Sequence, residues 1–191
     1  MGDTMAKKEL QPILGIIEAT YPGDPDVWNG NPMVRIRKGF KGPSSYKAAL
    51  GHLPLEIDGN MIGWYHGDPF PINTYISFNI LYNSSDHLSL KIFLDDETIN
   101  LGYPVGWSTF HYIKLNMMGY KTSNVRIRSL KINANTLGQY SSKGGDRTWF
   151  FRNHDSAPFS SIYISGNFYL SETLERKYFY EIPRFDFIFG S

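Results

Sequence analysis

Arg147 and Trp149 are the side chains whose types and spacing most clearly indicate binding chemistry. They follow the pair Gly144-Gly145, which permits a tight backbone turn because glycine adopts positive φ angles at low cost. A tryptophan face stacks on the apolar side of a pyranose, and a neighbouring arginine donates hydrogen bonds to sugar hydroxyls or a carboxylate. Because the two residues share strand parity, they lie together on the outer face if Phe150 points inward. The pattern predicts a site for a sugar or another flat polar ligand.

Catalytic and metal-binding patterns are missing from the sequence. The histidines lack the i, i+2 or i, i+4 spacing of a metal-binding pair, and they are His52, His66, His87, His111 and His154. The carboxylates that would suit a glycoside hydrolase stand mostly in turn-like or charged contexts, and they are Glu56, Asp95, Asp96, Glu97 and Glu175. The sequence has no cysteine, nucleophile elbow, phosphate loop or dinucleotide fingerprint. We therefore expect a protein that is not an enzyme and that uses neither a metal nor a cofactor.

Basic residues gather in two groups, which are Arg35, Arg37, Lys38 and Lys41, and Arg126, Arg128 and Lys131. On strands such residues usually form a solvated face, and the functional alternative is recognition of an anion or an acidic sugar. Lys143, beside the glycine pair, is a further cation of the candidate site. The formal net charge is only +1, so we expect no nucleic-acid partner, because affinity for nucleic acid comes from many phosphate contacts.

Residues with period-two alternation predict the strands that must position these side chains. Apolar and polar residues alternate over 34–37, 76–81, 88–94, 113–117, 125–128, 162–165 and 185–189, with turn-forming clusters between them, including 143–145. Aromatic residues make up 16% of the chain, and strands accommodate them well. Many short strands separated by turns predict an all-β fold, an antiparallel sandwich or barrel.

The residues 171–179 break this alternation. Ser171 is a capping-type residue, good helix formers follow it, and Pro183 ends the segment, so we predict a short C-terminal helix. The length of 191 residues suits a single domain over 1–191, with 1–10 as a polar, flexible lead-in. No apolar run approaches the roughly 20 residues of a membrane-spanning helix, and we expect no direct membrane insertion.

An ordered set of motifs in 71–183 is similar to a known family. Gly144-Gly145 leads through an additional Asp146 to Arg147-Thr148-Trp149-Phe150, and the segments 98–101 and 107–110 precede it. The strand with Ile162, Ile164, Phe168 and Tyr169 then leads into the predicted helix. In these features the chain resembles the head domain of the rotavirus outer-capsid spike protein, as a divergent member. The resemblance implies a galectin-like β-sandwich that binds host cell-surface glycans.

The resemblance also implies which residues would contact a glycan. His87 stands nearest the position of the arginine in the family's sialic-acid cleft, so sialic acid is not the ligand we favour. A second family site, for histo-blood-group or mucin-type glycans, corresponds to Arg147 and Trp149 on one side and to Glu175, Arg176 and Phe179 of the predicted helix on the other.

These features together predict a non-enzymatic viral attachment domain on the outer capsid surface of the virion, joined to the remainder of the spike protein. The alternative is a β-sandwich that serves as a structural or protein-binding module of a virus or phage particle. A jelly-roll glycoside hydrolase is the less favoured third interpretation.

Overall fold

The computed structural model describes residues 15–19, 31–38, 46–52, 61–66, 74–83, 87–104, 109–171 and 183–190. They form the strands β1 (Ile16–Ala19), β2 (Pro32–Lys38), β3 (Tyr46–His52), β4 (Met61–His66), β5 (Ile76–Asn83), β6 (Leu88–Phe93), β7 (Thr98–Tyr103), β8 (Tyr112–Ile132), β9 (Asn135–Asn153), β10 (Ser161–Leu170) and β11 (Arg184–Gly190). Every pairing between them is antiparallel. Within these residues no helix is long and apolar enough to cross a membrane.

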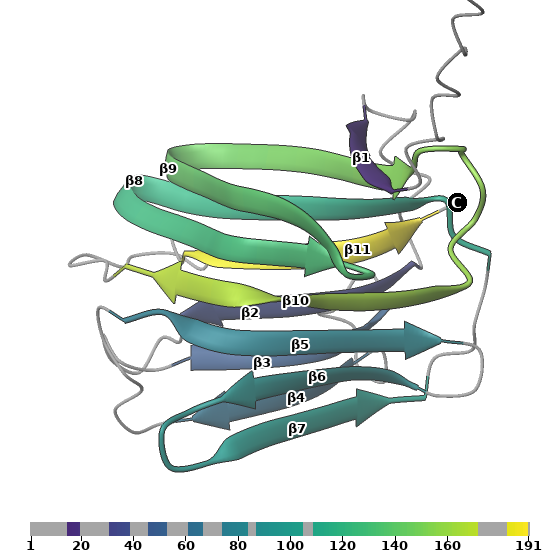
Figure 1. The fold of residues 1–191 in the computed structure, drawn as a ribbon. Coiled ribbons are helices and arrows are strands. Elements are labelled where there is room, and N and C mark those ends of the chain that lie inside the picture. Colours follow the sequence, from purple (N-terminus) through teal and green to yellow (C-terminus); the bar gives the residue numbers. More distant parts are fainter. Residues whose placement is uncertain are drawn as a thin grey trace, which may run out of the picture.

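The strands form one continuous sheet that folds into two layers (Figure 1). The front sheet has the order β7-β6-β5-β10 and continues into residues 124–132 of β8. The back sheet has the order β4-β3-β2-β11 and continues into residues 112–118 of β8. Strand β9 follows β8 through both layers, and β1 pairs with its last residues. The all-β, antiparallel sandwich-like fold predicted from the alternation is therefore confirmed.

A bend in the long β8–β9 hairpin joins the two layers. Gly119 pairs with Gly145, and the register of the hairpin shifts between Gly119 and Asn124. A β-carbon added at Gly119 would lie 2.9 Å from the Ser123 carbonyl oxygen, closer than real β-carbons come, and 3.0 Å from that of Ser142, which is tighter than most real contacts. The absence of a side chain at Gly119 thus lets the two strands approach closely where they change layers.

One local prediction on this hairpin is wrong. The segments 113–117 and 125–128 are strand, as predicted, and both belong to β8, but the glycine pair expected in a turn lies inside β9. Gly144 does use a positive φ of 66°, but for a bend within a strand. The turn of the hairpin is instead formed by Asn133 and Ala134, with φ angles of 47° and 67°, as a two-residue turn of the primed type requires.

The main core lies between the two layers and is rich in aromatic residues. Phe78 of the front sheet meets Phe185 and Phe187 of the back sheet, with ring centroids 5.6 and 6.0 Å apart. Tyr82 meets Phe189 in the same way at 5.6 Å. All five side chains are fully buried, so the inward residues of both layers form one hydrophobic cluster.

The outward face of the back sheet is also largely buried. Met33, Ala49, Phe150 and Ile188 form a second apolar cluster there. Beside it, the Arg35 guanidinium donates two hydrogen bonds to the Asp186 carboxylate, at 2.8 and 3.2 Å, between neighbouring strands. Arg35, Arg37 and Lys38 are therefore buried and do not form the solvated face that strand alternation suggested, and Lys41 lies outside the described residues.

The predicted C-terminal helix lies outside the described residues, which stop at Ser171 and resume at Pro183. Both ends of that interval are anchored to the sandwich. The Ser171 hydroxyl accepts a hydrogen bond from the Asn124 backbone N–H at 2.6 Å, and the Lys38 N–H donates to the Pro183 carbonyl at 3.1 Å.

Candidate functional site

The outward face of the front sheet carries a dense set of polar side chains. Alternation along β5 and β10 buries Phe78 and Phe168 and turns Ser77, Asn79, Ser165 and Asn167 outward. Ser77 pairs with Asn167, and Asn79 pairs with Ser165, so the four side chains stand in two neighbouring rows across the two strands. We call this surface, together with Lys91, Arg126, Arg128 and Lys131, the front-sheet face.

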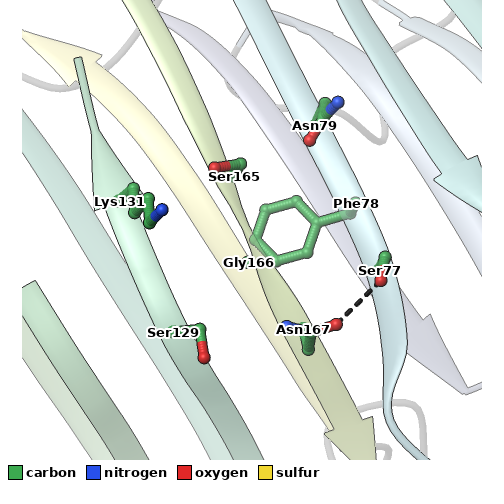
Figure 2. A pocket seen from close by; sticks show the side chains of 8 residues that line it. All are labelled: Ser77, Phe78, Asn79, Ser129, Lys131, Ser165, Gly166 and Asn167. Atoms are coloured by element: carbon green, nitrogen blue, oxygen red, sulfur yellow. Dashed lines mark hydrogen bonds between the residues drawn. The ribbon is translucent and has the colours of Figure 1, made fainter. Parts of the chain in front are cut away.

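A shallow depression of about 250 Å³ lies in the middle of the front-sheet face (Figure 2). It is lined by Ser77, Phe78, Asn79, Ser129, Lys131, Ser165, Gly166 and Asn167. The Ser77 hydroxyl donates a 2.7 Å hydrogen bond to the Asn167 side-chain oxygen, which leaves the Asn167 amide N–H groups as donors. Hydroxyls, amides and one ammonium thus surround the depression.

A β-bulge accounts for the depression. Ser165 pairs with Lys131 while Asn167 pairs with Arg128, so β8 has one more residue than β10 over this step. The extra length is absorbed by Ser129, which adopts a positive φ of 54°. Gly166 lies at the centre of the bulge, where an added β-carbon would come within 3.3 Å of the Phe78 ring and 3.4 Å of the Arg128 carbonyl oxygen. The bulge disrupts the regular ladder and shifts the alternation by one residue, so that Arg126 and Arg128 before it and Ser129 and Lys131 after it are all exposed.

Cations stacked on tyrosines flank the depression. The Arg128 guanidinium lies 3.8 Å from the centroid of the Tyr75 ring, and that of Arg126 lies 5.9 Å from the Tyr169 ring. The two tyrosine rings are themselves 5.7 Å apart. Stacking holds the planar guanidinium groups in place and leaves their N–H edges available to a ligand.

Exposed aromatic side chains lie on the same face. Among the described residues, the large hydrophobic side chains that are exposed are Phe93, at 38%, and Tyr163, at 42%. Phe93 is the cross-strand neighbour of Ser77, and Tyr163 follows the outward alternation of β10 two residues before Ser165. The polar depression is therefore bordered by accessible rings.

The sequence-predicted residues on β9 lie at the bend. Arg147 and Lys143 are exposed, Arg147 on the back-sheet part of the strand and Lys143 on the front-sheet part. Arg147 and Trp149 do lie on the same side of β9, and their cross-strand partners on β8 are Met117 and Leu115. Both partners belong to the main core and Trp149 packs against it, so this side of β9 is the one that faces the core. Trp149 was expected to face outward if Phe150 points inward. Phe150 instead belongs to the cluster on the outward face of the back sheet, so this condition is not met.

Trp149 closes the edge of the sandwich. Its ring meets Tyr140, nine positions earlier on the same strand, in an edge-to-face contact with centroids 5.2 Å apart. Tyr140 in turn meets Phe151 at 5.5 Å, and burial raises the pKa of the Tyr140 hydroxyl, with the Glu18 charge adding to the effect. Trp149 therefore has a packing role, and its assignment with Arg147 to a glycan site stays a prediction.

The remaining predicted residues are not brought together with these. His87 is exposed directly before β6, at the end of the sandwich that holds the Asn133-Ala134 turn, whereas Arg147 lies at the opposite end, near the bend. Glu175, Arg176 and Phe179 lie outside the described residues. No group of three histidine, aspartate or glutamate side chains that could hold a metal occurs within the described part of the chain.

No protein-family model matches the chain, and no curated protein matches it. The interpretation of the front-sheet face therefore rests on its own chemistry.

Sequence reasoning singled out the group Arg126, Arg128 and Lys131 but missed the depression beside it. The alternation over 76–81 and 162–165 places Ser77, Asn79 and Ser165 only on the solvent side of their strands and does not include Asn167. The available signal was the pairing of hydroxyl and amide residues in both strands, Ser77-Asn79 and Ser165-Asn167. Only the register shows that these four side chains adjoin Lys131.

Proposed function

We propose that this protein is a non-enzymatic carbohydrate-binding domain whose ligand lies on the front-sheet face. The observation that carries the proposal is the depression lined by Asn79, Asn167, Ser77 and Lys131 and bordered by the exposed rings of Phe93 and Tyr163. Sugars combine hydroxyl groups with apolar C–H faces. A surface that combines amide and hydroxyl side chains with accessible rings is complementary to both.

The polar side chains suit a ligand with many hydroxyls. An amide offers two donors and an acceptor, and a serine hydroxyl both donates and accepts, so each can serve a sugar hydroxyl in either role. The depression is shallow, and we expect each site to bind weakly. Such binding supports attachment when many copies act together.

The biological context follows from the resemblance to the rotavirus spike head. We propose that the domain attaches a virus particle to glycans on host cells, with the chain displayed on the outer surface of the virion. The same proposal includes a galectin-like arrangement of the sandwich and a short C-terminal helix. Support comes from the ordered motifs around Arg147 and Trp149 and from a surface with the chemistry of a lectin.

A glycan array with matched variants tests this function. We expect the wild-type protein to bind a subset of glycans, and Asn79→Ala to lower that signal at least fivefold while the melting temperature stays unchanged. Arg147→Gln is the matched comparison at the site predicted from sequence, and its signal should equal that of the wild type. Arg147 suits this comparison better than Trp149, because loss of the packed Trp149 ring would also destabilise the fold.

Two results would contradict the assignment. A wild-type array without any glycan signal argues against carbohydrate binding altogether. Loss of the signal in Arg147→Gln, with Asn79→Ala unaffected, moves the site from the front-sheet face to the β9 bend.

A further inference from the structure

The front sheet has an unusually one-sided charge. Its strand segments 76–83, 88–93, 98–103, 124–132, 135–143 and 161–170 contain no aspartate or glutamate. They contain five cations, which are Lys91, Arg126, Arg128, Lys131 and Lys143, and all five are exposed. Asp95, Asp96 and Glu97 lie in the turn between β6 and β7, so the strands themselves carry only positive charge, whereas the chain as a whole has a net charge of only +1.

The cations are arranged across and along the depression. Lys91 pairs with Asn79, Asn79 with Ser165, and Ser165 with Lys131, so one row crosses β6, β5, β10 and β8. Neighbouring strands lie about 4.8 Å apart, which separates the β-carbons of Lys91 and Lys131 by roughly 14 Å. That span exceeds a single monosaccharide, and the depression lies between its two ends.

Arg128 and Arg126 extend the positive charge along β8. They occupy consecutive outward positions, where Arg128 pairs with Asn167 and Arg126 with Tyr169. Both are engaged by tyrosine rings and by no carboxylate within the described part of the chain. A stacked guanidinium presents its edge to a carboxylate or sulfate in a fixed orientation, which favours a two-point contact.

We propose that the ligand of the front-sheet face is an acidic oligosaccharide with at least two anionic groups, uronate or sulfate, on different sugar units. The oligosaccharide crosses the strands, with neutral hydroxyls at Asn79 and Ser165 and its anionic groups at the two ends of the row, one at Lys91 and one at Lys131 beside Arg128. This inference rests on the proposed carbohydrate-binding function and defines its ligand class. A nucleic acid fits less well, because few phosphates can be neutralised by a face of this size in a chain of net charge +1.

Direct titration of the whole chain with size-matched ligands tests the inference. The ligands are a neutral hexasaccharide, a hexasaccharide with uronate as its only charge, a sulfated hexasaccharide and a single-stranded oligonucleotide of equal charge. At about 20 mM salt we expect the two acidic saccharides to bind at least tenfold more tightly than the other two. Raising the salt to about 300 mM should remove most of that preference, because the screening length falls from roughly 20 Å to below 10 Å.

Single substitutions locate the effect. Lys131→Gln and Arg128→Gln should each weaken the binding of the acidic saccharides at least fivefold more than the binding of the neutral saccharide. Arg147→Gln, an exposed cation on the back-sheet part of β9, is the matched control and should change neither. The ratio of uronate to sulfate affinity then shows which group is recognised.

The outcomes separate this inference from the function on which it rests. Equal, salt-independent binding of neutral and acidic saccharides overturns the charge preference and leaves carbohydrate binding intact. Absence of binding to every saccharide overturns both. Tighter binding of the oligonucleotide shows that the face recognises phosphate and overturns the proposed ligand class.

Discussion

Replacement of Gly119 by alanine should destabilise the protein at the bend that joins its layers. The added β-carbon meets the carbonyl oxygens of Ser123 and Ser142 at 2.9 and 3.0 Å. Both are backbone atoms, so relief requires β8 and β9 to separate locally. Overpacking of this kind costs about 1–3 kcal/mol. For a chain of this length each kcal/mol lowers the melting temperature by about 2–4 °C, and a cost of about 2 kcal/mol predicts a decrease of about 4–8 °C.

Gly145 supplies the matched control, since it is the direct cross-strand partner of Gly119. A β-carbon there meets nothing within 4 Å, and the φ of Gly145 is not positive. Gly145→Ala should leave the melting temperature within about 2 °C of the wild type. Both variants are compared by circular dichroism or calorimetry in one buffer. Equal melting temperatures for the two variants would refute the argument that close strand approach at Gly119 forms the bend.

Two further predictions concern stability. Ala134→Gly should raise the melting temperature by about 2–4 °C, because it removes roughly 1 kcal/mol of left-handed strain at φ 67° in the hairpin turn; an unchanged or lower value in thermal unfolding contradicts this. Burial raises the pKa of Tyr82 from 10.0 to about 12. The contribution of its neutral hydroxyl to the free energy of unfolding is therefore fully present below pH 10 and falls by roughly 3 kcal/mol as the pH rises to 12. In denaturant titrations between pH 10 and 12, the free energy of unfolding should fall less in Tyr82→Phe than in the wild type. An equal fall in the two proteins would contradict the raised pKa of the buried Tyr82 hydroxyl.

Alternation made most of the strands predictable. The patterns around Phe78, Leu90, Ile127, Ile164 and Phe187 each mark residues that the structure places in the core. A strand with one buried face must repeat every two residues, so this information is local and survives without knowledge of the partner strands. The same reasoning indicated an antiparallel sandwich or barrel.

Long-range pairing made the candidate site unpredictable. The glycine pair before Arg147 has the residue types of a turn. However, Gly145 pairs with Gly119 and Lys143 pairs with Asn124, so the strand continues through the glycine pair. Trp149 lies on the same side of the strand as Arg147, as expected. Which side faces the core depends on the cross-strand partner, and the partner of Trp149 is the core residue Leu115. A one-residue change of register would reverse that outcome.

The sequence by itself determined the strand content, the absence of thiol chemistry and the presence of cations and amides in alternating positions. Tertiary structure decided where those side chains meet. Asn79, Ser165 and Lys131 come from strands separated by tens of residues, and only the register of β5, β10 and β8 brings them to one depression. Local sequence specifies which side chains leave a strand together, whereas the neighbours they acquire depend on the bulge at Ser129 and the bend at Gly119, which pack strands distant in the chain.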